Sequence, residues 1–330
     1  MTPAGGEPSG PAPAWAATAP AARPQQHLGV AGDEEDAFEL RLLLGEVAYF
    51  AYGSNMAPSV LSGRRRVRPR VSVPAAAPAL RLSFGMLGFP FAEPAFATLV
   101  PPGHPLAAGG AAAPPAHGVL HAVSREEWAW ICSTEGVGSS SAGYQVVEVE
   151  CTPYRPGRRW EGGGGGGARR PALRAVTLQG APASLHDSRR NALPSSRYLG
   201  LLKTGAAHHG LCPSYRAYLD ALEPYGSGAG PSAPWRAAGA AAAAAVLASA
   251  AAPALPLIVG SRLLAGPPSG AGPAAAGGGG GGTAGPAPEA SPLEAVSAVL
   301  GAAAMRATWA VHDGVLASVF GSGCSNNNGR

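Results

Sequence analysis

The sequence is poor in charged residues and in cysteine. Charged residues make up 13% of the 330 residues, the formal net charge is +4, and Arg supplies nearly all of the positive side chains. The four cysteines (Cys132, Cys151, Cys212 and Cys324) are far apart and show no paired spacing. This pattern predicts free thiols in a reducing compartment and argues against a disulfide framework. No charged segment followed by an apolar core opens the chain, so we expect no secretory signal.

Glycine, proline and alanine are abundant instead, and they gather at the two ends of the chain. With few large apolar groups to bury, residues 1–46 are predicted to form a disordered extension. Residues 47–226 are expected to fold as one domain, and residues 227–330 to form a second low-complexity extension. A glycine run at 162–167 lacks the preceding strand and following helix that a phosphate-binding loop needs, so we interpret it as a flexible insert.

The densest positive charge is the run Arg64-Arg65-Arg66-Val67-Arg68-Pro69-Arg70. Such a run could contact phosphates, but it usually forms a solvated face or a loop. No aromatic residues are interleaved with it and no nucleic-acid motif is present, so no nucleic-acid partner is expected.

The stretch from Val47 to Met56 organises the rest of the chain. Its first half is an apolar, aromatic-rich run typical of a buried strand, and its second half breaks into Gly53-Ser54-Asn55, residues that favour turns. A turn that leaves a strand in this way presents backbone N–H groups in one concavity, which suits an anion or a developing oxyanion.

Alternating and helical patterns continue after this stretch. Strands are expected at 80–84, 95–100, 117–123, 144–151 and 172–178. The spacing Ser124 to Glu127 predicts a capping box at the start of a helix, and apolar spacing predicts helices from 196 to 207 and after Pro213. His117 and His121 fall on one face of a strand without a third ligand nearby, so we expect no metal site there.

Three segments, taken in order, resemble the γ-glutamylcyclotransferase family over about residues 47–222. They are Tyr52-Gly53-Ser54-Asn55, then Ser133-Thr134-Glu135-Gly136-Val137 with Tyr144 after it, then Pro194–Tyr198 leading into Gly205-Ala206 and Gly210-Leu211. The resemblance implies a mixed α/β (α+β) fold: a small, closed or nearly closed mixed β-barrel flanked by short helices. The opening segment is similar to the general branch of the family. The stretch 138–143 looks longer than the family's usual turn. The shape of the pocket wall and the choice of substrate therefore do not follow from the resemblance, whereas the assignment of Glu135 does.

The resemblance implies cyclisation of a γ-glutamyl amino acid or amine to 5-oxoproline with release of the amine. Because the substrate's own α-amine attacks its γ-carbonyl, the nucleophile is already tethered, and neither metal nor cofactor is required. One carboxylate whose pKa burial has raised can act as base and then as acid.

The resemblance assigns the catalytic role to Glu135. It implies that Tyr52, Gly53, Ser54 and Asn55 bind the glutamyl group, with Tyr144 and Tyr198 as supporting contacts. For these two tyrosines, packing in the core is an equally good interpretation.

Two other functions are considered. A serine hydrolase is disfavoured because no Gly-x-Ser-x-Gly segment is present. A non-catalytic binding module on the same fold is the stronger alternative, since a fold does not determine function. A module that had lost catalysis would be expected to have lost Glu135, so its presence favours the enzyme.

Residues 237–261 contain no charged side chain and are long enough to span a bilayer, which takes roughly 20 apolar residues. Their Ala content is only weakly favourable in lipid, and Pro253 and Pro256 would interrupt a helix. A membrane-associating segment and an alanine-rich disordered linker therefore both remain open. We expect a cytoplasmic protein, with a membrane-anchored or organellar one as the alternative.

Overall fold

A computed structural model describes residues 45–137, 143–160, 172–186, 192–227, 232–252 and 292–326. The predicted disorder of residues 1–46 falls almost wholly outside these ranges, as do the glycine run at 162–167 and most of the stretch 138–143.

Five strands close into a barrel in the order β1-β5-β2-β6-β7. Neighbouring strands pair antiparallel, except that β1 and β7 pair in parallel through Tyr49 and Val176. The strands are β1 (Val47–Ala51), β2 (Val71–Ala77), β5 (Ala116–Val123), β6 (Tyr144–Pro153) and β7 (Leu173–Gly180). The predicted fold class, a mixed α/β fold built on a closed mixed barrel, is confirmed.

The centre of the barrel is formed by strands that are buried throughout. Every residue of β1 and β5 is buried, which is why β1 appears in the sequence as a continuous apolar run and not as an alternation. His117 and His121 on β5 are 2% and 1% exposed, so both belong to the core. Burial lowers the pKa of His117 to about 4, and the ring remains a neutral packing group at neutral pH.

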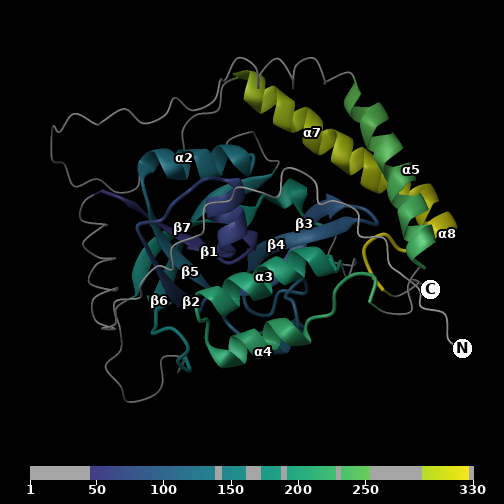
Figure 1. The fold of residues 1–330 in the computed structure, drawn as a ribbon. Coiled ribbons are helices and arrows are strands. Elements are labelled where there is room, and N and C mark those ends of the chain that lie inside the picture. The colour runs from purple at the N-terminus through teal and green to yellow at the C-terminus, as the bar shows by residue number, and fades with distance from the viewer. Residues whose placement is uncertain are drawn as a thin grey trace, which may run out of the picture.

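A separate antiparallel hairpin, β3 (Arg81–Phe89) and β4 (Glu93–Val100), stands beside the barrel (Figure 1). The two strands confirm the expected pair at 80–84 and 95–100, but both are longer than the patterns indicated. Gln179 on β7 donates a 2.8 Å hydrogen bond to the Leu99 carbonyl, which links the hairpin to the barrel.

The short helices begin and end where the local sequence predicts. Helix α2 (Arg125–Thr134) starts with the expected capping box between Ser124 and Glu127. Helix α3 (Ser196–His208) ends at Gly210, whose φ of +63° is the left-handed conformation that glycine tolerates. Helix α4 (Pro213–Ala221) opens on its proline, and a π-helical turn, η2 (Ser59–Arg64), follows Pro58.

Beyond residue 226, the helices in the described ranges pack at the tip of the β3–β4 hairpin (Figure 1). They are α5 (Ala233–Ala251), α7 (Pro292–Val311) and α8 (Ala317–Phe320), with a π-helical turn, η6 (His312–Leu316), between the last two. Phe91 of the hairpin turn is buried against Ala243 and Leu316, which forms a small second core. Trp309 donates a 2.8 Å hydrogen bond to the Gly88 carbonyl, and the Phe91 N–H donates one of 2.8 Å to Gly323.

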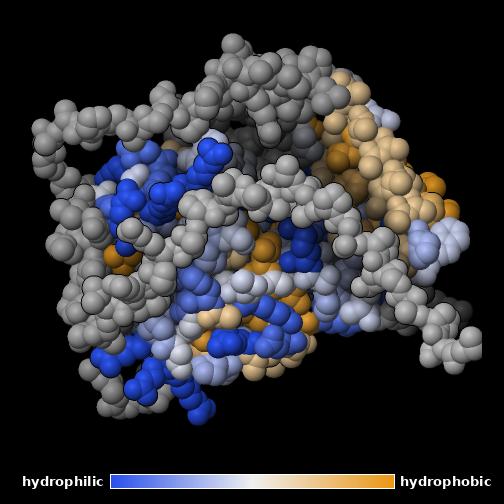
Figure 2. Space-filling view, viewed as in Figure 1, coloured by the Kyte–Doolittle hydropathy of each residue, from blue (hydrophilic) through white to orange (hydrophobic). Residues whose placement is uncertain are grey.

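Helix α5 contains the first part of the apolar segment 237–261, whereas residues 253–261 lie outside the described ranges. The side of the molecule formed by α5 is predominantly apolar in Figure 2. None of the helices in the described ranges is both long enough and apolar enough to cross a membrane.

Candidate active site

A cavity of about 370 Å³ opens between one end of the barrel, the β3–β4 hairpin and α3. All seven residues proposed from the sequence line it: Tyr52, Gly53, Ser54, Asn55, Glu135, Tyr144 and Tyr198. The structure therefore brings together segments that are up to 146 positions apart in the chain, as the distance from Tyr52 to Tyr198 shows. The remaining lining includes Tyr49, three arginines (Arg64, Arg65 and Arg197) and apolar groups from the hairpin, among them Phe96 and Ala97.

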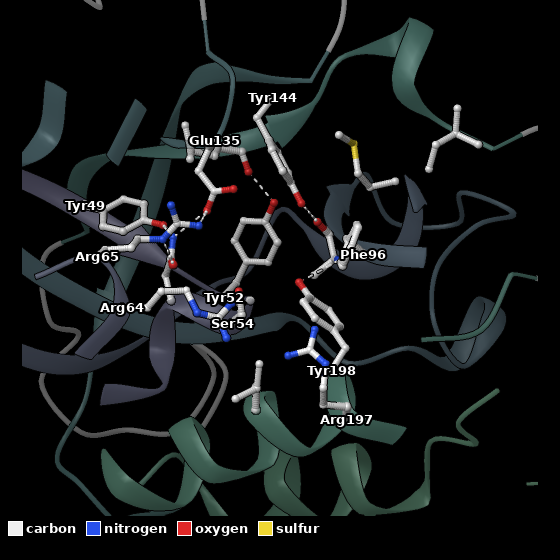
Figure 3. A pocket seen from close by; sticks show the side chains of 17 residues that line it. Tyr49, Tyr52, Ser54, Arg64, Arg65, Phe96, Glu135, Tyr144, Arg197 and Tyr198 are labelled. Atoms are coloured by element: carbon white, nitrogen blue, oxygen red, sulfur yellow. Dashed lines mark hydrogen bonds and ion pairs between the residues drawn. The ribbon is translucent and has the colours of Figure 1, made fainter. Parts of the chain in front are cut away.

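Glu135 is placed by the end of α2. It is the C-cap residue of the helix, and Gly136 follows with a φ of +70°. The Val137 N–H donates to the Cys132 carbonyl at 3.0 Å and the Gly136 N–H to the Ser133 carbonyl at 3.4 Å, which is the hydrogen-bond pattern of a Schellman motif. The Glu-Gly-Val sequence therefore ends the helix at a fixed point, and the Glu135 side chain extends into the cavity (Figure 3).

One oxygen of the Glu135 carboxylate is fixed by two donors. Its Oε1 accepts from Asn55 Nδ2 at 3.0 Å and from an Arg65 terminal nitrogen at 2.5 Å. Asn55 Nδ2 also donates to the Tyr49 hydroxyl at 2.8 Å, and Asn55 Oδ1 accepts from Arg65 Nε at 2.9 Å. Within the described residues, Oε2 has no hydrogen bond, so it is the oxygen left for a ligand.

Burial raises the pKa of Glu135, because a charged carboxylate loses hydration in the cavity wall. The positive charge of Arg65 and the hydrogen bonds from Asn55 and Arg65 oppose this effect without cancelling it. The side chains of Arg65 and Glu135 are only 14% and 18% exposed, so water screens the pair weakly. A carboxyl group in this setting is suited to exchanging protons near neutral pH.

The turn after β1 is a 3-10 turn, η1 (Ser54–Met56), whose first internal hydrogen bond runs from the Met56 N–H to the Gly53 carbonyl. The N–H groups of Ser54 and Asn55 precede that bond, so the turn itself does not use them. Helix α3 packs directly on the turn through Gly205. A Cβ added to Gly205 would lie 2.6 Å from Met56 Cβ and 2.8 Å from the Ala57 nitrogen. Glycine at 205 therefore lets the helix backbone approach the turn.

Three tyrosines form the wall opposite Glu135 (Figure 3). The Tyr52 hydroxyl donates to the Leu178 carbonyl, and the Tyr144 hydroxyl donates to the Ala97 carbonyl at 2.9 Å. The Tyr198 hydroxyl accepts from the Ala97 N–H at 3.1 Å. Burial raises the pKa of Tyr198 to about 12 and that of the other two well above the ordinary value, so all three are neutral at neutral pH.

The arginine run was only partly a solvated face. Arg64, Arg66, Arg68 and Arg70 are exposed, but Arg65 turns inward to form the ion pair with Glu135. The interpretation of Arg65 as a solvated residue was wrong. Arg65 lies ten residues after Asn55 in the sequence, and the buried carboxylate of Glu135 stabilises its positive charge. Tyr49 was also missed as a site residue. Because Tyr49 lies within an apolar strand, its sequence context indicates a core residue and not a hydroxyl group that accepts a hydrogen bond from Asn55.

Within the described ranges, no three His, Cys, Asp or Glu side chains are grouped closely enough to hold a metal ion. No family model matches the chain. Two structures of other proteins resemble it with a TM-score of 0.40 over 55% of this chain and 90% of theirs. One is a human protein described as uncharacterized, at 19% identity, and the other is a gamma-glutamyl cyclotransferase, at 18%.

Two curated proteins are similar in sequence. The chain is 32% identical over 189 residues to the gamma-glutamyl cyclotransferase gliK of Aspergillus fumigatus, which covers 55% of this chain and 64% of that protein. It is 30% identical over 203 residues to the gamma-glutamyl cyclotransferase aclK of Aspergillus oryzae, which covers 59% and 67%. The match thus spans about two thirds of the length of each relative. On this similarity, the chain belongs to the γ-glutamylcyclotransferase family.

Proposed function

We propose that the protein cyclises a γ-glutamyl amino acid or γ-glutamyl amine to 5-oxoproline and releases the amine. The observation that carries this proposal is the state of Glu135. Its Oε1 is fixed by Asn55 and Arg65, its Oε2 has no protein partner among the described residues, and burial raises its pKa. The two curated relatives, named gamma-glutamyl cyclotransferases, support the same activity.

The reaction begins with the α-ammonium group of the substrate beside Glu135. Oε2 removes one proton, and the free amine attacks the γ-carbonyl carbon of the same molecule to form the ring C–N bond. The carbonyl oxygen then carries the negative charge. We assign its stabilisation to the N–H groups of Ser54 and Asn55, which the turn does not use.

Collapse of this intermediate breaks the bond between the γ-carbon and the leaving nitrogen. Protonated Glu135 returns its proton to that nitrogen. The regenerated carboxylate then takes the second proton of the former ammonium group from the ring nitrogen, which becomes the lactam N–H, and passes it to the released amine, so no water is consumed. Arg65 and Asn55 are positioning residues in this scheme, because they fix Oε1 and leave Oε2 to move the proton. The wall of the cavity holds the glutamyl group in the folded conformation that attack requires, and it is formed in part by Tyr52, Tyr144 and Tyr198.

The test is to incubate the purified protein with γ-glutamyl-alanine and to follow 5-oxoproline. We expect product, and we expect Glu135→Gln to reduce turnover by several orders of magnitude while the amide still accepts from Arg65 and Asn55. Glu126→Gln is the matched control, because Glu126 is an exposed carboxylate on the same helix that accepts a hydrogen bond from the Ser124 hydroxyl and lies outside the cavity.

Two results would overturn the proposal. Wild-type-like turnover in Glu135→Gln would remove the general base from the mechanism. Absence of 5-oxoproline from γ-glutamyl dipeptides, γ-glutamylamines and glutathione, with ligand binding still detectable by thermal shift, would favour the binding module.

We further propose that the catalytic unit spans residues 47–226 and acts in the cytoplasm on a small-molecule substrate. The proposal is supported by the buried free thiols of Cys132, Cys151 and Cys212, which suit a reducing compartment.

A further inference from the structure

The mouth of the cavity carries more positive charge than the proposed chemistry requires. Among the described residues that line the cavity there are three arginines, whereas Glu135 is the one carboxylate. Arg65 is neutralised by Glu135. Arg197 is paired through its Nε with Glu93, which lies outside the lining, so Arg64 is the lining arginine with no acidic partner among the described residues.

Arg64 ends the η2 turn and is exposed. Within the described residues its side chain forms neither an ion pair nor a hydrogen bond, although it belongs to the cavity lining. Its five N–H donors are thus all available to a ligand.

Arg197 is held in place by Glu93. Its Nε donates to Glu93 Oε1 at 2.7 Å, and the same oxygen accepts from the Ser195 hydroxyl at 2.8 Å. Its terminal nitrogens have no partner among the described residues. A cation in the first turn of α3 opposes the helix dipole, so helix stability does not account for it.

The two arginines lie at the opposite end of the cavity from Glu135. Figure 3 shows their guanidinium groups extending toward one another, below Ser54 in that view. The Arg197 side chain is 56% exposed and that of Glu135 18%, so the arginines mark the solvent side. In the proposed reaction the glutamyl amine must reach Glu135, and the released amine must leave toward solvent.

We propose that Arg64 and Arg197 are specificity residues that bind a carboxylate on the leaving group of the substrate. This inference rests on the proposed function and narrows it: the chain favours γ-glutamyl compounds whose released part is an amino acid or peptide over those that release a neutral or cationic amine. Guanidinium groups pair with carboxylates through paired N–H donors, and two of them can hold one carboxylate.

The expected size of the effect follows from exposure. Ion pairs at solvated positions contribute roughly 0.2–1 kcal/mol, which corresponds to a factor of up to about five in affinity, and paired N–H donors add to it. We therefore expect each arginine to contribute about three- to tenfold to the preference for a carboxylate-bearing leaving group.

The experiment compares kcat/KM for γ-glutamyl-alanine with kcat/KM for γ-glutamyl-alaninamide, which differ only in the leaving-group carboxylate. The wild-type protein should prefer the first substrate. Arg64→Gln and Arg197→Gln should each reduce the ratio of the two kcat/KM values about three- to tenfold, mainly through KM, and the double variant should bring it close to one. Arg68→Gln is the matched control, because it removes one positive charge from the same run without touching the cavity.

Each other outcome has a definite meaning. Equal kcat/KM for both substrates in the wild-type protein would overturn this inference and leave the proposed function standing. Loss of activity toward both substrates in equal measure would show that the arginines bind the glutamyl carboxylate instead. A wild-type protein that turns over neither substrate would overturn the proposed function itself. A decrease of the ratio in Arg68→Gln equal to that in Arg64→Gln would show an effect of net charge alone.

Discussion

Replacing Arg65 by Gln should move the acid limb of the activity profile to higher pH. Glu135 acts as a base in the proposed mechanism, so kcat/KM rises as pH increases through its pKa. Burial raises that pKa, and the positive charge of Arg65 is the largest influence that lowers it. Without the arginine, the carboxylate would be harder to form, and a higher pH would be needed for the same activity.

The size of the shift can be worked from the ion pair. Arg65 contacts Glu135 Oε1 at 2.5 Å, and both side chains are less than one fifth exposed. Two unit charges about 4 Å apart attract by roughly 4 kcal/mol at an effective dielectric constant of about 20. An adjacent cation typically lowers the pKa of a carboxyl group by about one to three units. Because some water reaches this pair, we expect the acid limb to move up by about one to two pH units.

The assay is kcat/KM for γ-glutamyl-alanine from about pH 4 to pH 9, with Arg65→Lys as the charge-conserving control. The lysine variant should keep its limb near that of the wild-type protein, even though it loses the contact with Asn55 Oδ1. A limb that stays in place in Arg65→Gln, with activity reduced equally at every pH, would refute the electrostatic role and leave only a geometric one.

The same ion pair also sets the sign of the effect on stability. A carboxyl group whose pKa is raised in the folded state stabilises the fold at low pH, and this contribution is lost as pH rises through the raised pKa. Arg65→Gln should therefore lower the free energy of unfolding at neutral pH more than at pH 4, which denaturant titrations at the two pH values would measure.

Three further predictions concern the fold around the site. Gly205→Ala should destabilise the protein by about 1–3 kcal/mol in denaturant unfolding and raise KM, because the new methyl group meets the backbone at Met56 and Ala57; unchanged stability would show that α3 can move away. Trp309→Ala should cost about 3–5 kcal/mol of the stability of the C-terminal helices, since the indole is 2% exposed and bonded to Gly88; an unchanged melting temperature would contradict the packing. Burial raises the pKa of the Cys132 thiol to about 12, so Ellman's reagent at pH 8 should modify it only after denaturation, and rapid modification of the native protein would refute its burial.

The parts of the fold that could be predicted from sequence are those whose cause is local. The capping box from Ser124 to Glu127, the glycine stop at 210 and the proline start of α4 depend on residues a few positions apart, and all three are present. The continuous apolar run of β1 likewise predicts a strand buried on both faces. Apart from the neighbouring strands at 80–84 and 95–100, the sequence patterns did not predict which strands would pair, nor that the β3–β4 hairpin would leave the barrel, because pairing is decided between distant segments.

The residues of the candidate site also divide into those that could be proposed from the sequence and those that could not. Glu135 and the turn from Tyr52 to Asn55 could be proposed from the resemblance, and the structure places them around one cavity. Arg65 could not, because nothing in a run of arginines marks the one that turns inward. The signal that could have found it is spacing: Arg65 follows a short turn that begins beside Asn55, so its guanidinium can reach the same carboxylate that Asn55 reaches.

The C-terminal helices show how composition can hide a packed structure. Most of α5 is alanine, which the sequence could attribute equally to a membrane segment or to a disordered linker. In the structure α5 packs closely on the hairpin turn at Gly239, where an added Cβ would lie 2.9 Å from the ring of Phe91. Small residues on α5 therefore let an aromatic side chain from the hairpin turn enter between α5 and η6. The same hairpin supplies Phe96 and Ala97 to the cavity. The low-complexity composition is thus compatible with a close contact to the element that forms one wall of the candidate active site.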